Sequence, residues 1–107
     1  MRRKSKNIME LSDFGLEAEV EVISPAQAEA YLRNNVTQKR IVQNKVDKYL
    51  SQLRDGRWRL NGKVIVFDKN GRLLGGQHRL GAVVQSGVSL TTVVIRGVEP
   101  DVLETNK

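Results

Sequence analysis

The sequence contains no cysteine and a single histidine, His78. Without cysteine there can be no disulfide framework, no thiolate metal site and no cysteine nucleophile. One histidine does not predict a zinc site, and no serine lies in the nucleophile-elbow pattern that a serine triad would need. The lack of cysteine favours a reducing compartment, so we expect a cytoplasmic protein.

Long apolar runs are also missing. None approaches the roughly 18 residues of a membrane-spanning helix, and the basic start, residues 1–6, is not followed by the apolar core of a signal peptide. We therefore expect a soluble protein with no membrane partner. With 107 residues, the chain is long enough for one domain with a modest core.

Acidic residues are scarce in the middle of the chain. Residues 33–79 carry twelve basic and three acidic side chains, whereas residues 1–31 carry four basic and six acidic ones, and the formal net charge is +6. This distribution favours an anionic partner, such as a nucleotide, a nucleic acid or an acidic protein, and a merely solvated basic surface is the alternative. The candidate nucleic-acid contacts are Lys39, Arg40, Lys45, Arg57, Trp58 and Arg59. A tryptophan beside arginines can stack a base, but it can equally fill the core.

Local patterns predict a mixed α/β (α+β) domain over residues 16–107, preceded by a flexible basic arm, residues 1–15. Alternation predicts a first strand over residues 17–23, with Val20 and Val22 facing the core and Glu19 and Glu21 facing solvent. A hairpin with a turn over residues 68–71 follows later. The apolar run at residues 93–95 predicts that the last strand, residues 89–96, is buried on both faces.

Three helices are expected. Ser24-Pro25 has the form of an N-cap with proline at the first helical position, and this helix should end near Arg33. The second helix begins between residues 38 and 43, and Asp55-Gly56 ends it. The third helix is closed by Gly87, and its apolar face is formed by Leu80, Val83 and Val84.

The third helix begins in a glycine turn that predicts an anion site, formed by Gly75, Gly76, Gln77, His78 and Arg79. Glycine permits a tight turn and close backbone approach, and the first turn of a helix presents N–H groups with partial positive charge. His78 and Arg79 can add hydrogen bonds to a phosphate held there. Alternatively, Gly76 serves only the turn, and Arg79 pairs with a carboxylate such as Asp68 or Glu104.

Several spaced elements then carry a resemblance: Asp55-Gly56-Arg57-Trp58, Asn61-Gly62, Ile65, Phe67, Gly71, Leu73-Leu74, Gly76-Gln77-His78-Arg79-Leu80 and Ala82-Val83. In this order they resemble the ParB/sulfiredoxin-like superfamily, and more narrowly its small phage and bacterial members with an Asp-Gly-Gln-His-Arg-Leu motif. The resemblance covers roughly residues 20–100. It implies a compact single-domain fold with a small mixed sheet flanked by helices.

The resemblance also implies a ligand, ATP or CTP with Mg²⁺, gripped by Arg79 where Gly76 lets the backbone approach the phosphate. Activities in such relatives include nucleotide-dependent phosphotransfer, CTP-gated DNA clamping and suspected nuclease roles. Gln77 stands where sulfiredoxin has its cysteine, which rules out sulfiredoxin chemistry. Gly75 stands where the related pattern has aspartate, which casts doubt on Mg²⁺-dependent nucleotide hydrolysis, phosphotransfer or nuclease activity.

Two functions therefore remain open. The first is a ParB-like domain that binds a nucleotide or nucleic acid at the Gly75–Arg79 turn, in phage or bacterial DNA processing or modification. The second is a non-catalytic interaction protein that reuses the fold, for example a phage factor that occupies a host nuclease or another nucleic-acid-binding complex. Either would act in the cytoplasm, the host's if the chain is encoded by a phage.

Overall fold

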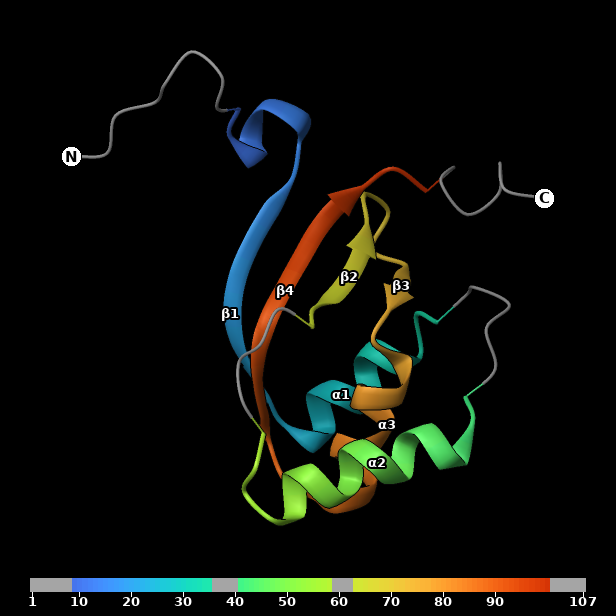
Figure 1. Ribbon diagram of the computed structural model, residues 1–107. Coiled ribbons are helices and arrows are strands. Elements are labelled where there is room, and N and C mark those ends of the chain that lie inside the picture. Colours follow the sequence, from blue (N-terminus) through green and yellow to red (C-terminus); the bar gives the residue numbers. More distant parts are fainter. Residues whose placement is uncertain (1–8, 36–40, 59–62, 101–107) are drawn as a thin grey trace.

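One mixed sheet with the strand order β1-β4-β2-β3 organises the computed structural model, which describes residues 9–35, 41–58 and 63–100 (Figure 1). Its strands are β1 (Glu17–Ile23), β2 (Ile65–Asp68), β3 (Leu73–Gly75) and β4 (Leu90–Val98). The central strand β4 runs antiparallel to β1 and parallel to β2, and β2 and β3 form the expected hairpin. Three of the predicted nucleic-acid contacts lie outside the described residues, namely Lys39, Arg40 and Arg59. Glu104, a possible partner of Arg79, lies outside them too.

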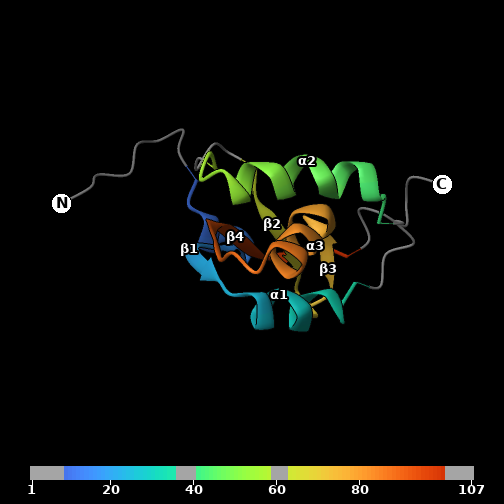
Figure 2. The ribbon, with the colours of Figure 1, turned by 90° about the horizontal axis from the view of Figure 1, so that it is seen from below.

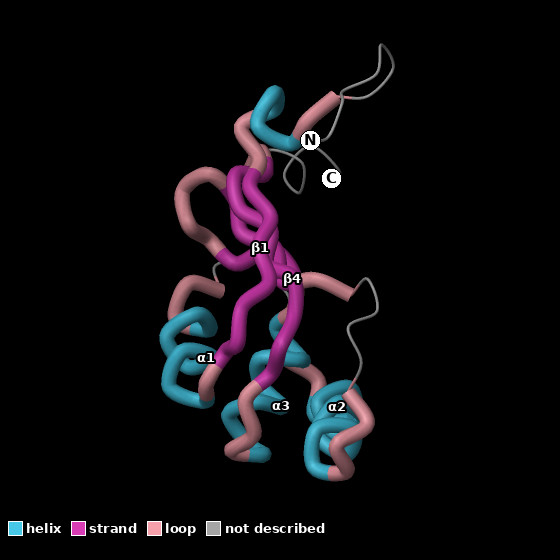
Figure 3. The backbone as a smooth tube through the Cα atoms, turned by 90° about the vertical axis from the view of Figure 1, so that its left-hand side faces the viewer, coloured by secondary structure: helices cyan, strands magenta, loops and turns pink. Residues whose placement is uncertain are grey.

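The helices gather at one end of the sheet, so that β1 and β4 extend beyond them (Figure 3). They are α1 (Pro25–Leu32), α2 (Gln43–Arg54) and α3 (Gln77–Ser86). The view from below places α1 and α2 on opposite sides of a middle layer that holds the sheet and α3, and α3 packs against both (Figure 2). These elements confirm the mixed α/β fold class. No helix in the described ranges is long and apolar enough to cross a membrane.

Local sequence signals explain where the helices begin and end. The Ser24 hydroxyl accepts a hydrogen bond from the Gln27 N–H at 3.1 Å, and Pro25 occupies the first turn, as its fixed φ allows. Gly56, just beyond α2, and Gly87, at the end of α3, have φ values of 66° and 72°, which only glycine adopts at little cost. The predicted boundaries of α1 and α3 are confirmed within one residue. Part of the expected N-terminal arm is also ordered, since the short 3-10 helix η1 spans Leu11–Phe14.

The core lies where the helices meet the sheet, and its fully buried side chains come from every layer: Ile23, Ala28, Val46, Ile65, Leu73, Leu80, Ala82, Val83 and Val94. Gly81 brings α3 close to α2, because a Cβ at this position would lie 3.4 Å from Val46 Cγ2. Tyr49 and Trp58 pack against this core from its rim.

The prediction that Val20 and Val22 face the core is wrong. Their side chains are 58% and 71% exposed, whereas Glu21, on the other face of β1, is half-buried beneath α1. There the Glu21 carboxylate accepts hydrogen bonds from Tyr31 at 2.7 Å and from Arg96 at 2.6 Å. These two partners satisfy the carboxylate, so the charged face of the strand can turn inward.

The last strand is also less buried than predicted. In β4 only alternate residues are buried, namely Leu90, Thr92 and Val94, so one face of the strand is covered and the other stays partly open. The buried Thr92 hydroxyl donates to the Lys63 carbonyl at 3.1 Å. Val84 of α3, which was expected in the core, is 36% exposed.

We expect acid to unfold the domain partly through Asp68, whose side chain is 0% exposed. Burial raises the pKa of Asp68, but hydrogen bonds from Arg72 and from the Asn70 N–H outweigh it and hold the pKa below its usual value. A lowered folded pKa gives stability that is present above the unfolded pKa and is lost as the pH falls through the folded one, here below about pH 4. The melting temperature of the wild type should drop steeply below about pH 4.

The matched variant is Asp68→Asn, which lacks the titrating carboxylate. It should be less stable near neutral pH, because it weakens three hydrogen bonds of 2.8 to 2.9 Å, and its melting temperature should fall less steeply in acid. The same steepness in both proteins would show that Asp68 does not govern the acid transition.

Candidate functional site

The turn from β3 into α3 is shaped by Gly76, which has a φ of 104° and serves as the helix N-cap without a side chain. A Cβ at this position would collide with Ile65 Cδ1 and lie 3.3 Å from Ile65 Cα. Ile65 is fully buried, so the missing side chain is required by packing against β2. The turn therefore needs glycine here for the core, whether or not a ligand is bound.

Gly75 is a different kind of glycine. A Cβ here would only touch the Val66 side chain at 3.9 Å, an ordinary van der Waals distance, and the φ is not positive. The backbone could therefore carry a side chain at position 75. The fold would therefore allow an aspartate at this position, the first residue of the Asp-Gly-Gln-His-Arg-Leu motif.

Arg79 lies in the first turn of α3, with its guanidinium half-buried 6.0 Å from the centroid of the Tyr49 ring. Its Nη1 is buried and has no hydrogen-bond partner among the described residues. Burial lowers the pKa of Arg79, and the nearby Tyr49 raises it only in part. An arginine stays protonated under such conditions, so a charged donor is left unsatisfied inside the protein.

A second cation adjoins the same aromatic ring. Lys63 Nζ lies 5.4 Å from the Tyr49 centroid and 3.5 Å from its hydroxyl oxygen. Arg79 has no ion pair in the described parts of the chain. The alternative in which Asp68 neutralises Arg79 is wrong, because the Asp68 carboxylate binds Arg72 at 2.8 Å. Two cations thus adjoin Tyr49, and within the described ranges Arg79 has no neutralising carboxylate.

His78 links the starts of two helices. Its Nε2 accepts a hydrogen bond from the backbone N–H of Val42, the N-cap residue of α2, at 3.0 Å. Nε2 is therefore engaged with the protein and is not the atom that would meet an anion. Gln77 is only 4% exposed, which makes it a buried residue of the turn.

The predicted nucleic-acid contacts within the described ranges lie on and just after α2. Lys45 is exposed, and Arg57 is held by Asp55 at 3.0 Å and by the Ser51 hydroxyl at 3.2 Å. Trp58 is half-buried, donates its ring N–H to the Thr91 carbonyl at 3.2 Å and packs edge-on against Tyr49 at 6.1 Å. These contacts favour the role of Trp58 in packing over a role in base stacking.

Two residues at this site were not singled out from the sequence, namely Tyr49, next to Arg79, and Lys63, next to Tyr49. Tyr49 belongs to the apolar stripe of α2, and Lys63 precedes β2, so nothing local marks either of them as part of a site. Only the packing of α2 against α3 brings Tyr49 to Arg79. A sequence pattern cannot show such a contact between segments far apart in the chain.

The fold and the turn together define a small mixed α/β domain with an unsatisfied cation in the first turn of a helix that follows a glycine. Comparison with protein-family models, with curated proteins and with solved structures finds no match to this chain.

Proposed function

We propose that this chain binds a phosphate-bearing ligand, a nucleotide or the backbone of a nucleic acid, at the Gly75–Arg79 turn. The observation that carries the proposal is the buried Arg79 Nη1, which lacks a hydrogen-bond partner in the described part of the chain. Leaving a charged donor unsatisfied costs about 1–3 kcal/mol or more, which an anion would recover. Arginine is well suited to this role, since its planar guanidinium can hold two phosphate oxygens at once.

The location of Arg79 suits a phosphate. A phosphate at the start of α3 would also interact with the positive end of the helix dipole, and the first turn of α3 contains no acidic residue that would repel it. Lys63, whose Nζ lies 5.4 Å from the centroid of the Tyr49 ring, adds a second cation nearby. The resemblance to ParB/sulfiredoxin-like proteins points to the same turn and suggests ATP or CTP with Mg²⁺ as the ligand.

Magnesium would arrive with the phosphates. In the described ranges, no group of three or more histidine, cysteine, aspartate or glutamate side chains gathers that could hold a metal ion by itself. We propose a binding function in phage or bacterial DNA processing or modification in the cytoplasm. Lys45, Lys48 and Arg54 on α2 are exposed and would extend the contact if the ligand is a nucleic acid.

A melting experiment tests the proposal. A ligand that binds only the folded state increases the free energy of unfolding, by about 2.7 kcal/mol at a concentration of 100 times its Kd, and so raises the melting temperature. We expect ATP or CTP with Mg²⁺, or a short DNA duplex or single strand, to produce such a rise, and the DNA effect to weaken steeply with salt. Adenosine and cytidine, which lack phosphate, are the matched controls and should have no effect. No rise with any phosphate-bearing ligand would contradict the proposal.

One observation favours the alternative of a non-catalytic interaction protein. The exposed Val20 and Val22 lie on one face of the edge strand β1, where the register places Val93 and Thr91 of β4 beside them. Exposed apolar side chains gathered on one sheet face are typical of protein interfaces. This function predicts a protein complex whose stability does not depend on nucleotide and is lost in Val22→Lys, while Arg79→Met leaves it intact.

A further inference from the structure

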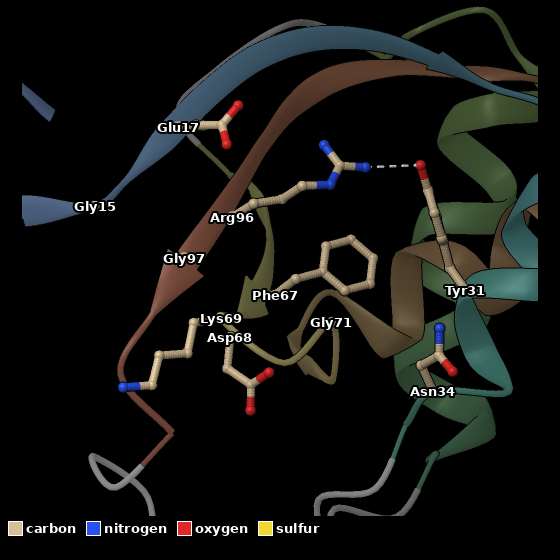
Figure 4. A pocket seen from close by; sticks show the side chains of 10 residues that line it. All are labelled: Gly15, Glu17, Tyr31, Asn34, Phe67, Asp68, Lys69, Gly71, Arg96 and Gly97. Atoms are coloured by element: carbon tan, nitrogen blue, oxygen red, sulfur yellow. Dashed lines mark hydrogen bonds between the residues drawn. The ribbon is translucent and has the colours of Figure 1, made fainter. Parts of the chain in front are cut away.

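A separate hollow of about 490 Å³ opens on the side of the sheet that faces α1 (Figure 4). None of its lining residues belongs to the Gly75–Arg79 turn. Its walls come from β1, β4, the end of α1 and the β2–β3 hairpin, and the residues that matter here are Glu17, Tyr31, Asn34, Phe67, Lys69 and Arg96. A hollow of this size suits a small organic group rather than a single ion.

The wall around Arg96 is fixed by internal contacts. Arg96 donates from Nη1 to Glu21 at 2.6 Å and from Nη2 to the Tyr31 hydroxyl at 3.0 Å, the second of which is drawn in Figure 4. The guanidinium also lies 5.3 Å from the centroid of the Phe67 ring. The Tyr31 hydroxyl in turn donates to Glu21 at 2.7 Å. Arg96 is thus committed to Glu21 and Tyr31.

Glu17 is left without a cation by this arrangement. In the register of β1 and β4, Glu17 is the direct partner of Arg96, yet the Arg96 guanidinium reaches along the sheet to Glu21 instead. The other cation of the hollow, Lys69, pairs with Glu99 at 3.1 Å. Within the described ranges the Glu17 carboxylate has no ion pair, because the Arg96 guanidinium neutralises Glu21 and not Glu17.

Both cations that line the hollow are paired with glutamates outside its lining, Arg96 with Glu21 and Lys69 with Glu99. The Asn34 side chain, which also lines the hollow, makes no hydrogen bond with any described residue and can offer its carbonyl oxygen as an acceptor. The hollow therefore presents acceptors and a free negative charge, beside the rings of Tyr31 and Phe67.

We propose that this hollow binds an organic cation, a guanidinium or ammonium group on an alkyl stem. The charged end would pair with the Glu17 carboxylate, and the stem would pack against the Tyr31 ring, as arginine and lysine side chains commonly do. The free carboxylate at Glu17 disfavours phosphate and other anions here. The cation could be a free molecule or the end of an arginine side chain on a partner protein, and the chemistry recognised is the same.

Backbone amide spectra of the full chain provide the test, with Gly15, Gly71 and Gly97, which line the hollow, as reporters. The probes are L-arginine amide, for a free cation, and an end-capped tetrapeptide with one central arginine, for a partner side chain. We expect saturable shifts of these three amides with at least one probe. Shifts that saturate with L-arginine amide would show that a free cation is enough for binding. Shifts that saturate only with the peptide would show that the site binds the side chain of a partner protein.

Two variants make the test specific. Glu17→Gln should weaken binding about tenfold or more, because it removes a charge-assisted hydrogen bond. Glu19→Gln removes another exposed carboxylate from the same face of β1, but Glu19 does not line the hollow, so binding should stay unchanged. Arg79→Met should not affect it either, which separates this site from the phosphate site. An absence of saturable shifts with both probes, or equal weakening in the two glutamine variants, would overturn the proposal.

Discussion

Replacing Arg79 with methionine is expected to abolish the rise in melting temperature that a phosphate-bearing ligand produces, while the unliganded domain becomes slightly more stable. Methionine keeps the contact of a long stem with Tyr49 but removes the buried, unsatisfied Nη1. Removing such a group gains about 1 kcal/mol, or roughly 4–8 °C in a domain of this size. Thermal unfolding with and without CTP and Mg²⁺ measures both effects.

Arg72→Met is the matched control for this variant. Arg72 is the cation that neutralises the buried Asp68, so its loss leaves a carboxylate inside the protein with backbone partners only. We expect it to destabilise the domain by about 3 kcal/mol and to leave the ligand-induced rise intact. If Arg79→Met instead destabilised the domain like Arg72→Met and kept the rise, Arg79 would be a structural residue.

Gly76→Ala is expected to destabilise the domain by about 3 kcal/mol, which lowers its melting temperature by roughly 15 °C. Two costs contribute. An alanine at a φ of 104° is strained, and its Cβ would collide with the fully buried Ile65. Urea unfolding, followed through the fluorescence of Trp58, measures the loss.

Gly75→Ala provides the comparison one residue earlier. Its Cβ would meet only the Val66 side chain at 3.9 Å, and we expect the stability to change by no more than about 0.5 kcal/mol. Equal losses in the two variants would mean that the turn is sensitive to any side chain and that the packing against Ile65 is not the cause.

Elements with strong local signals were predicted well from the sequence. Ser24-Pro25 fixes the start of α1 and Gly87 the end of α3, because a hydroxyl cap and a positive φ depend on neighbouring residues only. The same holds for the glycine turn before α3, where the sequence alone places Gly76 and Arg79 correctly at a helix start.

What depends on distant partners could not be predicted. The alternation in β1 shows two faces, but the face that turns inward is decided by Arg96 and Tyr31, which satisfy Glu21 from other elements. Likewise, Tyr49 reaches Arg79 only because α2 packs on α3, and Glu17 is left without an ion pair in the described ranges because Arg96 pairs with Glu21.

The central claim is that a phosphate binds at the start of α3, and a titration of the full chain with CTP and Mg²⁺, followed by backbone amide shifts, tests it most directly. We predict saturable shifts that are largest from Gly76 to Leu80 and are lost in Arg79→Met. Saturable shifts elsewhere with none in this turn, or shifts that persist unchanged in Arg79→Met, would contradict the claim.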